Sequence, residues 1–149
     1  MVDIIILIAC TLCGFVCGKY VEKRIKRKGE FFADLTRYAM LLKINVEGRK
    51  LELSKFNEEF STQCSPVFAD YLRDGKIRCS LNAMQKSNVT KFFDNISCAS
   101  SEELEKHIEY YSALLNADAK QVTEKEVAKA SVYVKLGVLF GMMVGIVLM

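Results

Sequence analysis

The sequence predicts an all-α protein: a small cytoplasmic helical bundle flanked by an N-terminal and a C-terminal transmembrane helix. Three observations lead to this prediction. Both ends of the 149-residue chain are apolar and nearly uncharged, the middle repeats apolar residues at helical spacing, and the whole chain holds one proline. We place the N-terminal anchor at 1–21, the bundle at 22–131 and the C-terminal anchor at 132–149.

The two apolar ends are long enough to cross a bilayer, which requires about 20 apolar residues in a helix. The first candidate is Val2–Val21, with Asp3 and Lys19 near its ends. The second is Val132–Met149, with Lys135 near its start. A lysine in that position can run its stem along the helix and place its amine at the interface. Both segments therefore predict membrane spans.

Basic residues predict the orientation of the first span. Asp3 is the one charge before it, and six basic residues follow it closely: Lys19, Lys23, Arg24, Lys26, Arg27 and Lys28. Because cytoplasmic flanks carry excess Lys and Arg, we expect the bundle in the cytoplasm and both termini on the opposite side. The same six side chains can also hold anionic lipid headgroups. A cleaved signal peptide, or a lipoprotein box ending at Cys10, fits less well because no basic residue precedes the apolar run.

Glycines recur at four-residue spacing in both apolar ends. Gly14 and Gly18 lie in the first, and Gly137, Gly141 and Gly145 lie in the second. In lipid, helices associate through close backbone contact, which small residues permit. We therefore expect helix packing at these glycines, although glycine is also common in membrane helices in general. The pattern leaves open whether the two spans pair with each other or with another chain.

The first half of the bundle predicts three amphipathic helices. One has apolar residues at helical spacing from Phe31 onward and ends near Gly48. A second covers about Leu51 to Gln63. The third has Ser65 as its cap, a proline in its first turn and Gly75 at its end.

The second half of the bundle predicts two short helices and one long one. The short helices are expected in IRCSLNAMQK and NVTKFFDNIS. Ser100 and Glu103 then predict a capping box. No glycine or proline follows until Gly137, so we expect the last long helix to run into the C-terminal span.

The residues present do not form a recognisable catalytic or ligand-binding pattern. The sequence has no phosphate-binding glycine loop and no G-x-S-x-G motif. Three cysteines lie inside the first apolar segment, the other three form no C-x-x-C pair, and His107 is the only histidine, which disfavours a zinc site. From Gly29 onward 15 basic side chains balance 16 acidic ones. We expect a non-enzymatic protein with no cofactor, metal or nucleic-acid partner.

The order of these segments resembles the stage III sporulation protein AB family. The ending KASVYVKLGVLFGMMVGIVLM is similar to the C-terminal anchor of that family, with Gly137 and Gly141 matching its two glycines. The stretch FADLTRYAMLLKINVEGRKLELSKF resembles the early helix pair, with Glu47 and Gly48 near its turn. Lys43 stands where the family usually has a glutamate, and DNISCASSEE lacks the Leu-Gly pair that usually precedes the long helix.

The resemblance implies a component of the channel assembled between mother cell and forespore during endospore formation. It implies a domain similar to the platform (F) subunit of type II secretion and type IV pilus machines, located in the mother-cell (outer forespore) membrane. Expected partners are a cognate secretion-type ATPase, other channel membrane proteins, the lipid bilayer and a further copy of the chain. Two alternatives stay open: a small pore-forming, holin-like membrane protein, and a membrane-anchored adaptor or sensor.

Overall fold

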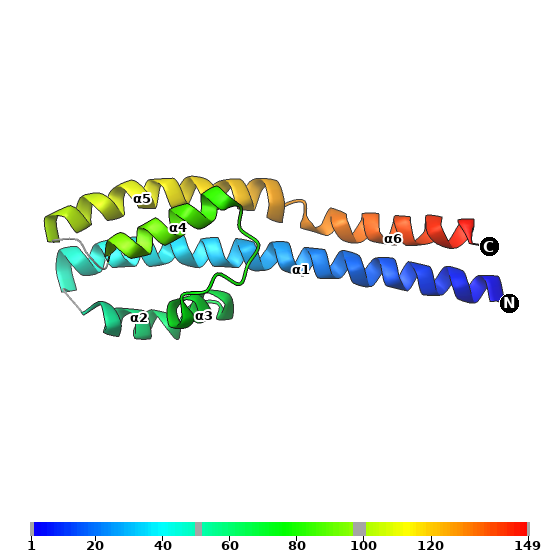
Figure 1. Cartoon of the computed structure of the whole chain (residues 1–149), viewed down its shortest axis with the longest axis horizontal. Coiled ribbons are helices and arrows are strands. Elements are labelled where there is room, and N and C mark those ends of the chain that lie inside the picture. Colours follow the sequence, from blue (N-terminus) through cyan, green and yellow to red (C-terminus); the bar gives the residue numbers. More distant parts are fainter. Residues whose placement is uncertain (1, 50–51, 97–100, 149) are drawn as a thin grey trace. The chain divides into compact units, whose positions relative to one another are not determined.

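The computed structural model describes residues 2–49, 52–96 and 101–148, and this part of the chain is all-helical, as predicted (Figure 1). Six α-helices and two π-helical segments follow one another: α1 (Val2–Ile44), η1 (Asn45–Arg49), α2 (Leu53–Ser61), α3 (Pro66–Asp74), α4 (Ala83–Ile96), α5 (Ser101–Gln121), η2 (Val122–Val127) and α6 (Ala130–Val147).

The chain divides into two compact units. The first, which we call the helix pair, holds residues 1–26 and 123–149, and the second, the bundle, holds residues 27–122. Helix α1 contributes to both, because its α-helical structure is unbroken from Val2 to Ile44. The boundaries expected at 21/22 and 131/132 fall inside α1 and α6.

The bundle is built around aromatic side chains. The predicted stripe of α1 is buried at Phe31, Leu35, Tyr38 and Leu42. The Tyr38 ring lies 5.2 to 5.7 Å, centroid to centroid, from rings on α2, α3 and α4, namely Phe56, Phe60, Phe68 and Phe93. Burial of such large apolar surfaces is the main favourable term in folding. The Tyr38 hydroxyl stays satisfied because it donates to Asn57 Oδ1 at 2.6 Å.

Helix α3 begins and ends at the residues that the sequence predicted. Ser65 is its N-cap, Pro66 its first residue, and Gly75 ends it in the left-handed region with φ of 66°. The Ser65 side chain makes no capping bond. Instead the backbone N–H of Ser65 donates to Asp34 Oδ2 on α1 at 2.8 Å, which places a carboxylate at the positive end of α3.

The second half of the bundle differs from the prediction. Where two short helices were expected, the chain is non-helical from Gly75 to Asn82 and then forms the single helix α4. A reciprocal capping box begins α4: Gln85 N–H donates to Asn82 Oδ1 at 2.7 Å, and Asn82 N–H donates to Gln85 Oε1 at 3.2 Å. This cap stops the helix from extending back over IRCSL. The capping box expected at Ser100 lies outside the described residues.

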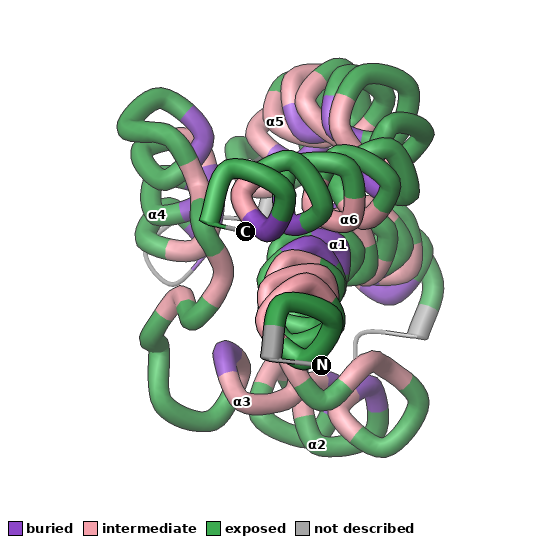
Figure 2. Tube along the Cα trace, turned by 90° about the vertical axis from the view of Figure 1, so that its right-hand side faces the viewer, coloured by how far each residue is buried: buried purple, intermediate pink, exposed green. Residues whose placement is uncertain are grey.

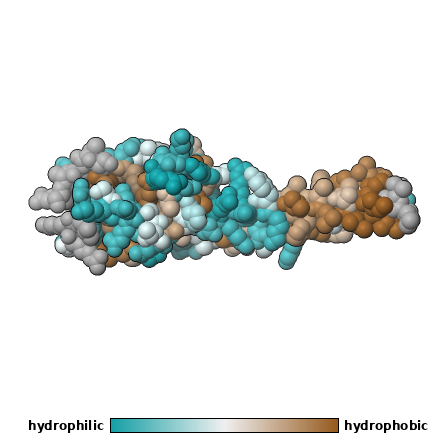
Figure 3. All heavy atoms as spheres, turned by 90° about the horizontal axis from the view of Figure 1, so that it is seen from below, coloured by the Kyte–Doolittle hydropathy of each residue, from teal (hydrophilic) through white to brown (hydrophobic). Residues whose placement is uncertain are grey.

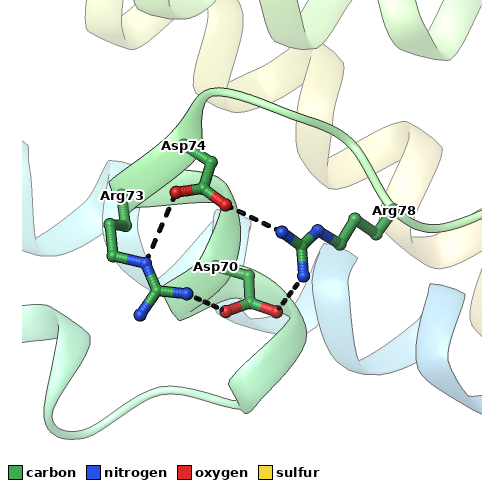
Figure 4. Close-up of polar contacts among 4 residues, drawn as sticks. All are labelled: Asp70, Arg73, Asp74 and Arg78. Atoms are coloured by element: carbon green, nitrogen blue, oxygen red, sulfur yellow. Dashed lines mark hydrogen bonds and ion pairs between the residues drawn. The ribbon is translucent and has the colours of Figure 1, made fainter.

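The non-helical segment after α3 is fixed by charged side chains (Figure 4). Asp70 and Asp74 each contact two arginines. Arg78 reaches Asp70 at 3.0 Å and Asp74 at 2.7 Å, and Arg73 reaches them at 2.8 and 3.4 Å. The four residues therefore connect the end of α3 to the segment that follows it.

The last long helical stretch changes type before it enters the C-terminal apolar segment. Ile108, Leu115 and Val122 are buried along one stripe of α5 and the segment that follows it. From Val122 to Val127 the hydrogen bonds are π-helical, and Ala128 N–H still donates to Thr123 O at 3.1 Å. A turn at 128–129 precedes α6. The α-helical hydrogen-bonding pattern is therefore interrupted just before the candidate span.

Candidate functional site

The five glycines singled out in the sequence lie where α1 and α6 cross within the helix pair. A Cβ atom built on Gly14 would stand 3.1 Å from the Cα of Gly141 and would collide with the carbonyl oxygen of Gly137. A Cβ on Gly18 would stand 2.8 Å from the carbonyl oxygen of Tyr133. The backbones are in direct contact, so no side chain fits between them.

The contacts follow an antiparallel register. Cys10 faces Gly141, Gly14 faces Gly137, and Gly18 faces Tyr133, so each four-residue step up α1 matches four residues down α6. Gly145 continues the row, because its Cβ would meet Leu7. Figure 2 shows the buried positions of α6 on the side turned toward α1. The question that the sequence left open has an answer here: the two apolar segments of one chain pair with each other.

The outer surface of the helix pair is apolar. Exposed side chains of α1 include Ile5, Leu12 and Val16, and those of α6 include Leu139 and Phe140. Figure 3 shows one continuous hydrophobic surface of this kind in brown. Among the described residues, two helical stretches are long and apolar enough to cross a membrane, Asp3–Gly48 and Glu103–Val147. This fits a membrane protein.

The structure separates the six basic residues into groups with different surroundings. Lys19 Nζ lies 2.9 Å from Glu22 Oε2, and Lys26 Nζ lies 2.8 Å from Glu22 Oε1. The Lys26 and Lys19 ammonium groups hold the pKa of Glu22 below its ordinary value. Lys23 and Arg27 are exposed, Lys28 is buried, and Arg24 and Lys28 each have an interaction partner.

Glu22 is the residue of this region that sequence reasoning missed. Its side chain is 9% exposed because it lies on the same stripe of α1 as Gly14 and Gly18, at the next four-residue step. That spacing was available in the sequence. It indicates a carboxylate on the inner face of α1, between two lysines that it can neutralise.

His107 and Cys79 are two of the remaining polar side chains, and their surroundings differ. His107 packs its ring 4.4 Å from that of Tyr111, and no residue in the described part of the chain bonds its Nε2. Burial raises the pKa of the Cys79 thiol to about 11, which keeps it protonated and poorly nucleophilic. The described ranges contain no cluster of three or more His, Cys, Asp or Glu that could hold a metal ion.

Comparison with known families identifies the chain. The sequence profile of stage III sporulation protein AB matches residues 51–149, about two thirds of the sequence. The chain belongs to this family. The match begins at residue 51, so it includes α6 with its three glycines but not the glycines of α1 or the basic run.

Membership in the stage III sporulation protein AB family supports a role in stage III of sporulation. No curated protein matches the chain at the threshold applied, and no solved structure does. The pairing of α1 with α6 and the contacts of the basic residues are therefore described from the structure of this chain.

Proposed function

We propose that this member of the stage III sporulation protein AB family is a non-enzymatic membrane platform of the mother cell–forespore channel. It holds the bundle in the cytoplasm for a cognate secretion-type ATPase and passes movement to membrane partners. The observation that carries the proposal is helix α1, whose α-helical structure runs unbroken from an apolar candidate span to the buried aromatic residues of the bundle.

Helix α1 is suited to transmit movement because each residue of a helix is hydrogen-bonded to the next turn. The C-terminal part of α1 contains Phe31 and Tyr38, which pack on rings of α2, α3 and α4. A displacement of the bundle would therefore reach the first span through a stiff element. The second connection, through 122–129, contains π-helical turns and a turn, and helices kink at π-helical turns.

The basic run supports the orientation that this function requires. Lys and Arg beside a span favour the cytoplasmic side, and they lie at the bundle end of the first apolar segment. We propose that 22–131 lie in the mother-cell cytoplasm, that the chain sits in the outer forespore membrane, and that both termini lie on the other side. Other channel membrane proteins would then meet the outer surface of the helix pair.

Co-purification tests the partner. The tagged full-length chain would be extracted from sporulating cells in mild detergent, and bound proteins would be identified by mass spectrometry. We expect the cognate ATPase in near-stoichiometric amount and in a saturable complex when it is titrated back. Recovery of a well-folded, monodisperse chain that never retains the ATPase would contradict the platform function.

Insertion of a flexible segment tests the role of α1. Four residues of Gly-Ser after Gly29 should abolish sporulation while the protein accumulates normally, because they interrupt the stiff connection. The same insertion after Lys129 is the matched control, and it should be tolerated because the chain already turns there. Equal defects, or a defect at 129 alone, would assign transmission to the other connection.

A further inference from the structure

The polar end of the helix pair is strongly cationic. Apart from Asp3 near the N-terminus, residues 1–26 and 123–149 hold seven basic side chains and three acidic ones, Glu22, Glu124 and Glu126. Each basic residue lies within a few turns of the glycine crossing. An excess of positive charge at one level of the helix pair attracts anionic groups from its surroundings.

Two of these cations share one carboxylate of the protein. Lys19 and Lys26 both reach the carboxylate of Glu22, one through each oxygen. Because the Glu22 side chain is only 9% exposed, this carboxylate is poorly accessible to other cations. Lys19, Lys26 and Glu22 together carry one net positive charge. The two lysines therefore contribute less to binding at the outer surface than two lysines without an acidic partner would.

Among the other exposed lysines, three lie nearest the glycine crossing. Lys23 is nine residues from Gly14, which places it on the opposite side of α1. Lys135 is two residues from Gly137 and so faces away from α1, and Lys129 is exposed at the start of α6. No carboxylate of the described residues lies within ion-pairing distance of any of the three.

Two exposed tyrosines lie at the level of these lysines. Tyr20 is 69% exposed and Tyr133 is 46% exposed, and the antiparallel register puts them within about one helical turn of each other along the pair. Toward the termini most exposed side chains are apolar, among them Ile4, Leu12 and Phe140. Tyrosines and lysines gathered next to an apolar surface are typical of a membrane–water interface.

We propose that Lys23, Lys129 and Lys135, with Tyr20 and Tyr133, bind the phosphate-bearing headgroups of anionic phospholipids, and that Lys19 and Lys26 do not. The proposal rests on the membrane placement given above and is independent of the ATPase. A lipid suits these residues better than free phosphate does, because apolar side chains next to the lysines can contact its acyl chains.

The test measures lipid selectivity of the purified full-length chain. Reconstituted in phosphatidylcholine bilayers, it would be probed by electron paramagnetic resonance with spin-labelled phosphatidylglycerol and spin-labelled phosphatidylcholine. We expect about a fivefold higher association constant for phosphatidylglycerol, the factor that one interfacial lysine contributes. The variant K23Q/K129Q/K135Q should lose this preference. The matched control K76Q/K86Q/K91Q removes the same charge from exposed lysines of the bundle and should keep it.

A second variant should increase the preference for phosphatidylglycerol, and it tests whether Glu22 limits lipid binding by Lys19 and Lys26. Glu22→Gln releases Lys19 and Lys26, so the preference for phosphatidylglycerol should rise above that of the unmodified chain. An unchanged preference in Glu22→Gln, or in the triple lysine variant, would overturn the proposal. An equal loss of the preference in K76Q/K86Q/K91Q would also overturn it, because the preference would then depend only on the net charge of the protein. Displacement by potassium phosphate, but not by potassium chloride of equal ionic strength, would show that the site takes free phosphate.

Discussion

Gly137 and Gly14 face each other with no room for a side chain on either: a Cβ on Gly137 would stand 3.3 Å from the carbonyl carbon of Gly14 and closer still to its oxygen. Without water to drive association, contacts of this kind hold membrane helices together. The Gly137→Ala variant must separate the backbones of α1 and α6, so we expect a loss of about 1–3 kcal/mol in the stability of the pair. Unfolding in detergent micelles measures it.

Gly48 provides the control for this variant. A Cβ on Gly48 has no atom within 4 Å, and the residue has no left-handed backbone. Gly48→Ala should therefore change stability by no more than about 0.5 kcal/mol. Equal effects of the two alanines would show that helix propensity, rather than the close contact of α1 with α6, determines the result.

Asp34 predicts a second stability effect, this time in the bundle. Its carboxylate accepts the N–H of Ser65 at the start of α3. The Asp34→Ala variant leaves that N–H without its partner, and hydrogen bonds to charged groups contribute about 1.5–3 kcal/mol. We expect a loss near the lower end of this range, because Asp34 is only half-buried. Glu30→Ala, one turn earlier and exposed, should be nearly neutral in the same unfolding measurement.

Arg78 should have a smaller, salt-dependent effect. It connects Asp70 and Asp74 to the segment after α3, but all these side chains are partly exposed. Surface ion pairs contribute about 0.2–1 kcal/mol and are screened by salt. Arg78→Gln should therefore lower stability within this range at low ionic strength, and the difference from the unmodified chain should disappear in about 1 M salt. Lys76→Gln, two residues away and without the acidic partners, should show neither effect.

The sequence predicted those elements whose signals are local. The Phe31, Leu35, Tyr38 and Leu42 stripe and the Pro66-to-Gly75 boundaries of α3 depend on residues within one helix, and both are present. The expectation of two helices, at 77–86 and 88–97, was wrong for the described residues, because Asn82 and Gln85 form a capping box that begins α4 at Ala83. That box is readable in the sequence as Asn-x-x-Gln.

The pairing of α1 with α6 could not be read from spacing. Four-residue glycine repeats indicate a small-residue face without naming what covers it. The register instead depends on contacts between residues more than 100 positions apart, such as Gly18 with Tyr133. The π-helical turns at 122–127 also lack a local signal, since that segment contains neither glycine nor proline.

Alkaline pH should weaken the bundle through Tyr71. Burial, with a smaller contribution from the Asp94 carboxylate, raises the pKa of Tyr71 to about 12. In the unfolded chain a tyrosine ionises near pH 10, so the unfolded state loses its proton first. The stabilising contribution is therefore complete below about pH 10 and declines as the pH rises toward about 12. Absorbance of tyrosinate at 295 nm and helical ellipticity, followed together against pH, would measure it.

Phenylalanine variants show which tyrosine causes the loss of stability at alkaline pH. Tyr71→Phe removes the ionisable group but keeps the ring, so the fall in stability above about pH 10 should become shallower. Tyr110→Phe removes a phenol that is 64% exposed and should leave the pH dependence unchanged. Burial also raises the pKa of Tyr38, so part of the dependence should persist in Tyr71→Phe. An identical pH profile in Tyr71→Phe and the unmodified chain would contradict the assignment.

A disulfide between the two apolar segments offers the most direct test of their pairing. A Cβ on Gly145 would stand 3.6 Å from the Cβ of Cys10, within the range that a disulfide bridges. With the other five cysteines changed to serine, Gly145→Cys should oxidise to an intramolecular disulfide that runs as a monomer on non-reducing gels. Ile146→Cys, one residue on and exposed to the surroundings, should form none. Dimers from Gly145→Cys would instead mean that α1 of one chain pairs with α6 of another.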